Sequence, residues 1–526
     1  MNALHRLASR LFARPLWLAP LLGVIAACGF APLHLWPLTL LAIACLIELT
    51  ARAGSWKRAA LIGWLFGIGH FSLGNNWIAT AFTYQAQMPA WLGWIAVFAL
   101  SLYLAVYPML AALGAWFFRH RPVALVLAIA ATWIISEWLR SWVFTGFAWN
   151  PLGVAALGPF DRPGLAVFSA WLGTYGLSGV MVLLAGCWLV AMKHRPFNWR
   201  GAMLALVPLA MLLQPGAIRV TDPSGAAAYT LIQPNIAQDV LNNSANFETQ
   251  FTKTAQLTVP KTPGEQRLVL WPESGLHDYL REGYPAEDYA WGTYAGDPVL
   301  ARQRIAQVIG PGALLMTGAV DLEIRKGEIV GARNVVTALD SEGVIRGSYA
   351  KAHLVPGGEY LPMRELLEPI GLARLVPGDI DFWPGPAART LDLGVMGKAG
   401  VQICYEIVFS GEVVDAEHRP DFIFNPSNDG WFGTWGPPQH LAQARLRAIE
   451  EGLPVLRATT NGISAVIDAH GIVRQSIPRG VAGRIDGYLP QALPPTLFSQ
   501  AGNMLPLGLA AALLGLALLV LRRARG

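Results

Sequence analysis

Three polar residues, each placed at the end of a short apolar run, have the side chains needed for acyl transfer by a nucleophile. Cys404 follows the mostly apolar run 391–401, which is typical of a buried strand that ends in a sharp turn. Glu273 follows the run 268–271 and a proline, and Lys351 ends another run. A nearby ammonium lowers the pKa of a thiol, and a carboxylate can take the thiol proton. The same ammonium can stabilise an oxyanion, so the trio suits acyl chemistry if its members converge.

Each of these residues also has an ordinary structural interpretation. A free cysteine such as Cys404 is often a small buried hydrophobe, and a lone cysteine is only a candidate nucleophile. A Glu or Lys after a strand is usually a solvated loop residue. The strand ends could meet at one edge of a sheet, but the sequence alone does not show that they do.

The composition predicts a membrane protein. The chain has 526 residues, of which 54% are hydrophobic and only 14% are charged, far from the usage of soluble proteins. Three of the four cysteines lie in apolar runs, so neither a disulfide framework nor a cysteine-based metal site is expected. The net charge of +5 comes from basic clusters between the apolar runs, and it does not argue for binding to nucleic acid.

The apolar runs predict about eight membrane spans. They lie near 15–30, 33–49, 59–77, 91–118, 122–139, 165–192, 202–213 and 505–521. Several are shorter than the roughly 20 residues that cross a bilayer, so their ends are approximate. Lys and Arg cluster before the first span, in alternate loops and after the last span, which predicts that both termini are cytoplasmic. The long segment between the seventh and eighth spans would then face outward.

A few polar residues lie within the spans, notably His70 and the pair Glu137 and Arg140. Polar groups inside a membrane often indicate function, but these could also satisfy one another at helix ends. The outward loop 142–164 carries aromatic residues, among them Trp149, that could anchor at the membrane interface.

The sequence pattern over residues 217–498 predicts one α/β domain. Short β-type runs recur there and alternate with helical stretches, which favours a layered α/β sandwich. The expected strands are 228–233, 267–271, 313–318, 334–339, 344–350, 399–404, 421–425, 455–460 and 464–467. The expected helices are 247–257, 299–309 and 439–451. We therefore expect a membrane domain of seven helices at 1–216, an outer domain at 217–498, and a last span with a short basic tail at 499–526.

Several motifs resemble those of the apolipoprotein N-acyltransferase family. The outer part contains Trp-Pro-Glu-Ser at 271–274, Ile-Cys-Tyr-Glu at 403–406 and Asn-Pro-Ser-Asn-Asp-Gly-Trp-Phe-Gly at 425–433. It also contains Lys-Ala-His-Leu-Val-Pro-Gly-Gly-Glu-Tyr-Leu-Pro at 351–362. The membrane part adds Thr-Gly-Phe-Ala-Trp-Asn-Pro-Leu-Gly at 145–153. The resemblance spans nearly the whole chain.

This resemblance implies a nitrilase-like αββα sandwich with Glu273, Lys351 and Cys404 as its triad. It places further needed residues around the triad, namely Glu359, Tyr405 and Glu406. Residues expected to bind substrate or lipid are Trp431, Trp149 and Tyr360. One departure is visible, because the family often has Lys-Trp where this chain has Leu241 and Asn242.

The resemblance also implies a two-step reaction. Cys404 would take an acyl chain from a phospholipid, phosphatidylethanolamine being preferred, and form a thioester. The acceptor would be the α-amine of the S-diacylglyceryl-cysteine that begins a lipoprotein. Lys351 and backbone N–H groups near Tyr405 would stabilise the oxyanion, with Glu359 and Glu406 positioning Lys351 and Glu273. No cofactor or metal is implied, and we expect a monomer in the bacterial inner membrane with its catalytic domain in the periplasm.

Two segments, 278–296 and 360–376, could be arms that dip into lipid or could simply pack on the sandwich. Two other functions are compatible with parts of the sequence. A membrane-tethered amidase would use the same triad and release a free acid. A transporter or binding scaffold would not need Cys404 at all, although polar residues in the spans are too sparse to suggest an ion path.

Overall fold

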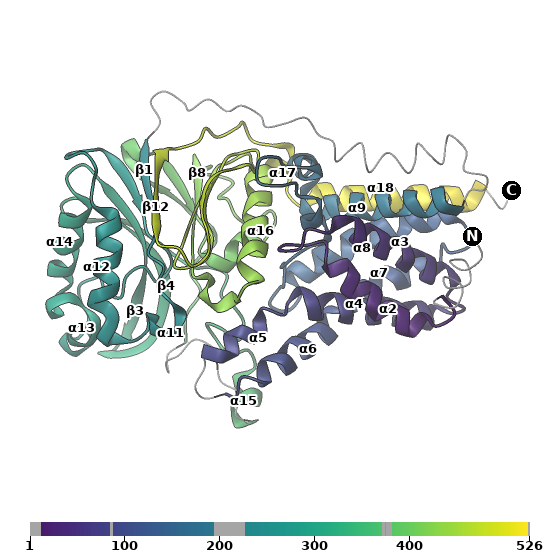
Figure 1. Cartoon of the computed structure of the whole chain (residues 1–526), viewed down its shortest axis with the longest axis horizontal. Coiled ribbons are helices and arrows are strands. Elements are labelled where there is room, and N and C mark those ends of the chain that lie inside the picture. Colours follow the sequence, from purple (N-terminus) through teal and green to yellow (C-terminus); the bar gives the residue numbers. More distant parts are fainter. Residues whose placement is uncertain (1–11, 85–87, 194–226, 371–373, 375–380, 524–526) are drawn as a thin grey trace. The chain divides into compact units, whose positions relative to one another are not determined.

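The computed structural model describes residues 12–84, 88–193, 227–370, 374 and 381–523 (Figure 1). These residues form two compact units. The first unit takes in 12–79, 91–193 and 496–523, and the second takes in 80–84, 88–90, 227–370, 374 and 381–495. The short segment around residues 80–84 therefore belongs to the second unit although its neighbours on both sides belong to the first. Nothing in the sequence signals this insertion.

The first unit is helical. Its helices are α2 (Pro15–Ala27), α3 (Trp36–Arg52), α4 (Trp56–Gly74), α6 (Leu92–Leu104), α7 (Val106–Trp116), α8 (Pro122–Trp142), η2 (Leu152–Ala156), η3 (Leu165–Phe168), α9 (Ser169–Lys193), α17 (Leu497–Ala501) and α18 (Met504–Arg523). A short helix, α5 (Ile78–Ala81), leads from the first unit into the second. The helix α9 contains one non-helical residue, Gly173, with φ +65°.

Four helical segments among the described residues are long and apolar enough to cross a membrane. They are Leu92–Trp116, Pro122–Trp142, Leu165–Leu189 and Met504–Arg523. The apolar helix Pro15–Ala27 is shorter than that. The predicted span at 202–213 lies outside the described residues. Eight spans therefore remain a prediction, whereas membrane-spanning character is supported by these helices.

Close backbone contact between α2 and α4 depends on glycine. A Cβ atom on Gly23 would lie 2.0 Å from the carbonyl oxygen of Phe66, and one on Gly69 would lie 2.0 Å from that of Pro20. Only glycine allows two helices to approach this closely, as is common among helices packed in membranes.

Glu137 and Arg140, two buried polar residues of α8, hold the loop that follows this helix. The Glu137 carboxylate accepts hydrogen bonds from Trp133 Nε1 at 2.9 Å and from the backbone N–H of Leu152 at 2.8 Å. Arg140 Nη1 donates to the carbonyl of Trp149 at 2.8 Å. These contacts favour the structural interpretation of Glu137 and Arg140 over a functional one.

The second unit contains two six-stranded sheets. The first sheet has the order β12-β1-β2-β3-β4-β5 and the second has the order β11-β10-β9-β8-β7-β6. Their strands are β1 (Ala228–Gln233), β2 (Arg267–Leu270), β3 (Leu314–Arg325), β4 (Glu328–Asp340), β5 (Ile345–Ala350), β6 (Thr390–Asp392), β7 (Lys398–Val401), β8 (Phe422–Ser427), β9 (Val455–Thr459), β10 (Ser464–Ile467), β11 (Val473–Ile477) and β12 (Gly483–Tyr488).

Helices cover the outer faces of the two sheets. The unit's helices are η1 (Phe82–Tyr84), α11 (Gln238–Leu241), η4 (Ser244–Asn246), α12 (Phe247–Thr258), α13 (Ala286–Gly292), η5 (Tyr294–Gly296), α14 (Pro298–Ile309), α15 (Arg364–Leu367), η6 (Glu368–Ile370), η7 (Gly394–Met396), η8 (Cys404–Val408), η9 (Asp429–Phe432) and α16 (Gly436–Glu451). Figure 1 shows α12 and α14 outside the first sheet and α16 outside the second. The predicted α/β sandwich is therefore confirmed, with the layers α, β, β and α.

Strand direction brings the ends of several strands to one edge. In the first sheet β2 is parallel to β3, and β5 runs in the same direction because two antiparallel pairings separate it from β3. The carboxyl ends of β2 and β5 therefore lie at the same edge, as do those of the parallel strands β7 and β8 in the second sheet. Ligand sites in α/β proteins commonly form at such carboxyl ends.

The structure differs from the predicted strands in three places. The strands predicted at 313–318 and 334–339 extend toward each other as β3 and β4 and pair as one long hairpin. The run 391–401 is not one strand but two antiparallel strands, β6 and β7, with a turn through Gly394 and Gly397. The strands β11 and β12 were not predicted, because their half-exposed residues do not form an apolar run.

Candidate active site

Cys404 begins the turn η8, three residues after the end of β7. Its side chain is buried, and its backbone is left-handed with φ +52°. A left-handed conformation costs a residue with a Cβ atom roughly 1–3 kcal/mol and persists only where the surroundings enforce it. Such strained turns are common where a reactive side chain is presented, so the backbone of Cys404 supports the predicted sharp turn.

Lys351 follows β5 and is buried between two carboxylates. Its Nζ lies 3.0 Å from the carboxylate of Glu359 and 3.6 Å from Oε1 of Glu273. Burial favours the neutral amine, but the negative charges of Glu359 and Glu273 outweigh it and raise the pKa of Lys351 above its ordinary value. Lys351 is therefore a fixed positive charge in the site.

Asn334, in the interior of β4, joins the two carboxylates. Its Nδ2 donates to Glu273 Oε1 at 2.7 Å and to Glu359 Oε1 at 3.0 Å. The other oxygen of Glu273 accepts a hydrogen bond from the backbone N–H of Asn428 at 2.8 Å. We call Glu273, Lys351, Glu359 and Asn334 the ammonium cluster. It holds one positive and two negative groups in a buried place.

The thiol of Cys404 interacts electrostatically with the ammonium cluster. Burial is the largest cause that raises the pKa of Cys404 well above its usual value, and the charge of Glu273 adds to it. The charge of Lys351 acts in the opposite direction and lowers this pKa. The resting residue is therefore a thiol, and a base must take its proton before sulfur can attack.

Glu406 ties together the segments that follow Lys351 and precede Cys404. Its Oε1 accepts hydrogen bonds from Tyr349 Oη at 2.8 Å and from the backbone N–H groups of Ala352 at 2.7 Å and His353 at 3.1 Å. Its Oε2 accepts from the backbone N–H of Ile403 at 2.7 Å. Burial raises the pKa of Glu406 to about 7. Its hydrogen bonds go to the backbone and to Tyr349, so it holds the segments next to Lys351 and Cys404 and does not bond directly to Lys351 or Glu273.

The remaining predicted residues lie in different surroundings. The ring of Tyr405 is buried and meets Phe409 edge-on at 5.1 Å. Trp431 is half-buried and meets Tyr84 edge-on at 5.8 Å, so the segment around residues 80–84 contacts the loop after β8.

Tyr360 and Trp149, both predicted to contact lipid, differ in exposure. Tyr360 is half-buried, and its carbonyl accepts a hydrogen bond from the N–H of Gly357 at 2.9 Å. Trp149 belongs to the first unit, where its buried ring packs at 4.6 Å on that of Trp77. The lipid contacts of Trp431, Tyr360 and Trp149 remain predictions.

Sequence reasoning missed several polar residues around the predicted triad, of which all but the half-buried Asn334 are buried. They are Asn334, Asn428, Asp429, His440 and Arg457. Asn428 and Asp429 lie in the motif at 425–433, and His440 lies in the stretch 439–450, which continues the family resemblance, so these positions were part of the resemblance but were not predicted as site residues. Within the described part of the chain, no group of three His, Cys, Asp or Glu side chains is placed to hold a metal ion.

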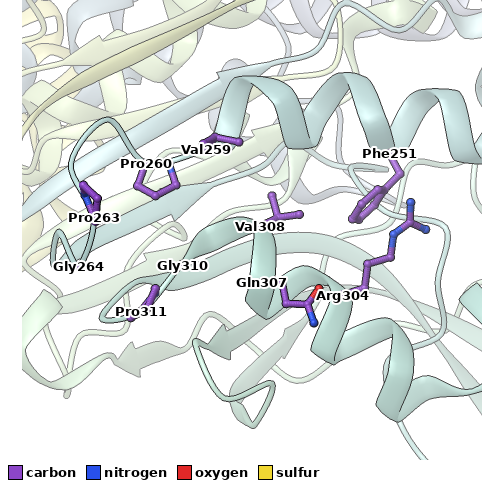
Figure 2. Close-up of a pocket in the computed structure, with 10 residues that line it drawn as sticks. All are labelled: Phe251, Val259, Pro260, Pro263, Gly264, Arg304, Gln307, Val308, Gly310 and Pro311. Carbon is purple, nitrogen blue, oxygen red and sulfur yellow. The ribbon is translucent and has the colours of Figure 1, made fainter.

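A hollow of about 630 Å³ lies elsewhere in the second unit, between the ends of α12 and α14 (Figure 2). Proline, valine and glycine residues form much of its lining, and Arg304 lies over the ring of Phe251 at 3.7 Å. None of the predicted site residues lines it. It is therefore distinct from the site around Cys404.

The fold and the site define the second unit as a carbon–nitrogen hydrolase domain. Residues 229–483 match the family model described as carbon-nitrogen hydrolase, and residues 22–187 match that described as apolipoprotein N-acyltransferase N-terminal domain. An apolipoprotein N-acyltransferase of Rhodopseudomonas palustris is 34% identical over 553 residues, covering 100% of this chain and 99% of that protein. One of Bradyrhizobium diazoefficiens is 34% identical over 526 residues, covering 96% and 94%.

The chain belongs to the apolipoprotein N-acyltransferase family. The predicted resemblance, the nitrilase-like domain and the assignment to the acyltransferases are thereby confirmed, and the chain is a membrane protein. Among solved structures, an amidase of Nesterenkonia AN1 from the nitrilase superfamily matches 51% of this chain and 93% of its own, at 20% identity and a TM-score of 0.33. At that score the likeness adds nothing to the family assignment.

Proposed function

We propose that this protein transfers an acyl chain from a phospholipid to the N-terminal amine of a diacylated lipoprotein, through a thioester on Cys404. The observation that carries the proposal is the ammonium cluster, because its charges act directly on the pKa of a thiol at a left-handed turn. Relatives that cover nearly the whole chain carry the name apolipoprotein N-acyltransferase, which supports the lipoprotein as acceptor.

In the first step Glu273 takes the proton from the Cys404 thiol as sulfur attacks the ester carbonyl of the phospholipid. The carbonyl oxygen becomes an oxyanion, which Lys351 and the backbone N–H of Tyr405 stabilise. The intermediate collapses as the C–O bond breaks, and the departing alkoxide takes the proton from Glu273. The products are a thioester and a lysophospholipid. Phosphatidylethanolamine is the donor that we propose, since the family resemblance implies it.

In the second step the α-amine of the lipoprotein's S-diacylglyceryl-cysteine attacks the thioester. Glu273 takes a proton from the attacking amine, the C–S bond breaks, and the sulfur regains a proton from Glu273. The product is an amide, and the enzyme returns to its starting state. No cofactor or metal enters either step.

The charges of the site suit this use of Glu273. Moving the thiol proton to Glu273 creates a thiolate and neutralises a carboxylate, so the number of buried negative charges does not change. Without such a transfer, a third anion would join Glu273 and Glu359 around one ammonium, which a buried site strongly disfavours. Glu359, bonded to Lys351 at 3.0 Å, keeps the ammonium in place.

We further propose that the chain works as a monomer in the bacterial inner membrane, with the domain 217–498 in the periplasm and both termini in the cytoplasm. The support is the distribution of Lys and Arg, which cluster in alternate loops of the membrane part. The remaining segments, 1–216 with seven spans and 499–526 with one, would anchor the domain. An apolar pocket next to the bilayer would keep water from the thioester.

The products distinguish this function from that of an amidase. Purified protein is incubated with phosphatidylethanolamine vesicles and a diacylated lipopeptide, and mass spectrometry follows the peptide and free fatty acid. We expect an N-acylated peptide that contains one acyl chain from the phospholipid, and none with Cys404→Ala. Free acid without acylated peptide would contradict the proposal and favour hydrolysis.

A further inference from the structure

A second buried polar cluster lies on the carbonyl side of Cys404, and neither step above uses it. It consists of Asp429, His440 and Arg457, whose side chains have no exposed surface. We call it the carbonyl cluster, because His440 Nε2 lies 3.0 Å from the backbone carbonyl oxygen of Cys404. Burying three titratable groups is costly, and the contact of one of them, His440, with Cys404 points to more than packing.

The contacts of His440 determine which ring nitrogen carries hydrogen. A carbonyl oxygen only accepts, so Nε2 carries the hydrogen and donates to Cys404. Nδ1 lies 3.0 Å from both Arg457 Nη2 and Asp429 Oδ1. Burial and the charge of Arg457 lower the pKa of His440, which favours a neutral ring whose Nδ1 accepts from Arg457. If the ring were charged, Nδ1–H would donate to Asp429 instead. The bond to Cys404 persists in both forms.

Arg457 fixes this arrangement to the strands of the second sheet. Its Nη2 donates to both carboxylate oxygens of Asp429, at 2.7 and 2.8 Å. Its Nη1 donates to Ser427 Oγ at 2.9 Å and to the side-chain oxygen of Asn425. Asn425 Nδ2 in turn donates to the carbonyl of Gln402 at 2.7 Å. The ring of His440 is therefore held from β8 and β9, and it has little freedom to move away from Cys404.

Holding the carbonyl of Cys404 has two consequences for its neighbours. A trans peptide is planar, and its C=O and N–H groups point in opposite directions. The bond from His440 therefore turns the N–H of Tyr405 to the opposite side, where it would donate to the oxyanion. The bond also resists rotation of the peptide that follows Cys404. This restraint matters because the left-handed backbone conformation of Cys404 is otherwise unfavourable for an L-residue.

We propose that His440, held by Asp429 and Arg457, is a positioning residue for acyl transfer, and that its Nε2–H fixes the peptide between Cys404 and Tyr405. This inference rests on the proposed function for its consequence in catalysis. Its geometric part does not depend on the acyl donor, because any reaction of the Cys404 thiol would sense the same turn.

The test compares three substitutions that differ in the donor they offer. In His440→Gln, an amide N–H can reach the place of Nε2, whereas the shorter side chain of His440→Asn ends near Nδ1. His440→Leu offers no donor. With phosphatidylethanolamine vesicles, we expect kcat for acylation of Cys404 to fall about 100-fold in the Asn and Leu variants, with KM within about twofold of the wild type. The Gln variant should recover to within about tenfold of wild-type kcat.

A second measurement needs no lipid. Alkylation of Cys404 by iodoacetamide, followed on its peptide by mass spectrometry, should be slow in the Asn and Leu variants and restored in the Gln variant. Leu446→Ala is the matched control, because Leu446 is a buried residue of the same helix that donates no side-chain hydrogen bond. It should lower the melting temperature and leave both rates unchanged.

The outcomes separate this inference from the proposed function. Alkylation that follows the donor series in a protein that phosphatidylethanolamine does not acylate would support the positioning role and overturn the acyl donor. Wild-type rates in His440→Asn, or a His440→Gln variant as slow as His440→Leu, would overturn the positioning role. If the Leu variant does not fold, the Gln and Asn variants, which differ by one methylene group, still decide the question.

Discussion

The two buried clusters that flank Cys404 are built differently. The ammonium cluster sets one cation, Lys351, between two carboxylates and in electrostatic contact with the thiol. The carbonyl cluster pairs one cation, Arg457, with one carboxylate and bonds to the backbone of Cys404 through a neutral ring. The first cluster has an excess of negative charge and can accept a proton. The second is internally balanced and has no such reason to change its protonation.

This difference suggests that the ammonium cluster and the carbonyl cluster act on Cys404 in different ways. Charges near the thiol decide when it can become a thiolate, and these come mainly from Glu273 and Lys351, with a smaller contribution from Asp429. Hydrogen bonds to the carbonyl decide where the thiol and the next N–H lie, and the shorter of them comes from His440 at 3.0 Å, with Asn425 Nδ2 at 3.5 Å. Changes at Glu273 or Lys351 should alter the pKa of the thiol as well as the rate, whereas substitution of His440 should alter rates through geometry.

The largest effect is expected for Lys351→Met. Acyl transfer should fall about 1,000-fold or more, because the oxyanion loses its cation and the two buried carboxylates keep only neutral hydrogen-bond donors. Alkylation of Cys404 should slow as well, because the charge of Lys351 lowers the thiol pKa. Removing one partner of a buried ion pair also destabilises a protein by about 3–5 kcal/mol, so the melting temperature should drop. Acylation within tenfold of the wild type would contradict this role.

Glu273→Gln should separate thiol reactivity from catalysis. Acyl transfer should fall about 100- to 10,000-fold, since the general base is lost. Alkylation should become faster at a fixed pH, because the negative charge of Glu273 raises the pKa of Cys404 and its removal lowers that pKa. The midpoint of the alkylation rate against pH should therefore move to lower pH. A parallel fall of both rates would show that Glu273 does not act as proposed.

Asn334→Leu should have an intermediate effect. The substitution removes the amide that bridges Glu273 and Glu359, and an unsatisfied buried acceptor costs about 1–3 kcal/mol. We expect kcat to fall about tenfold while Lys351 keeps the carboxylates in the site. Thr337→Val, at a buried position of the same strand, is the control and should keep wild-type kcat. An inactive Asn334→Leu protein with a normal melting temperature would mean that the bridge matters far more than its hydrogen bonds suggest.

Tyr349→Phe should have the smallest effect. It removes one hydrogen bond to Glu406 at 2.8 Å and leaves the three from backbone N–H groups. Thermal unfolding in detergent should show a loss of about 1 kcal/mol, and acyl transfer should stay within about threefold. A 100-fold loss of activity would place Tyr349 in the chemistry rather than beside it.

Candidate site residues that follow a strand were easier to find in the sequence than those inside a strand. Glu273, Lys351 and Cys404 stand out because an apolar run changes abruptly to a polar residue. Asn334 lies inside β4, where either face of the strand could bury it, and nothing in its neighbours indicates a partner 61 positions away. In the sequence, Arg457 is a single polar residue within the apolar strand β9. Its pairing with Asp429 depends on how β8 and β9 align.

The membrane part shows a similar limit. In the part of the chain that the structure describes, hydropathy located helices at the expected runs, because every backbone group in a bilayer must be bonded within a helix. It does not decide whether a helix of 13 residues such as α2 crosses the bilayer, since that depends on packing against α4. Hydropathy also could not reveal that the segment around residues 80–84 belongs to the second unit, because no change of composition marks this segment.

The most direct test of the account is the mass of the peptide that contains Cys404. After incubation with phosphatidylethanolamine vesicles alone, we predict that this peptide carries one acyl chain in a thioester, and that adding a diacylated lipopeptide removes it and yields the acylated lipopeptide. A folded protein whose Cys404 peptide stays unmodified, or whose adduct the lipopeptide does not discharge, would contradict the central claim that Cys404 carries the acyl chain between the two lipids.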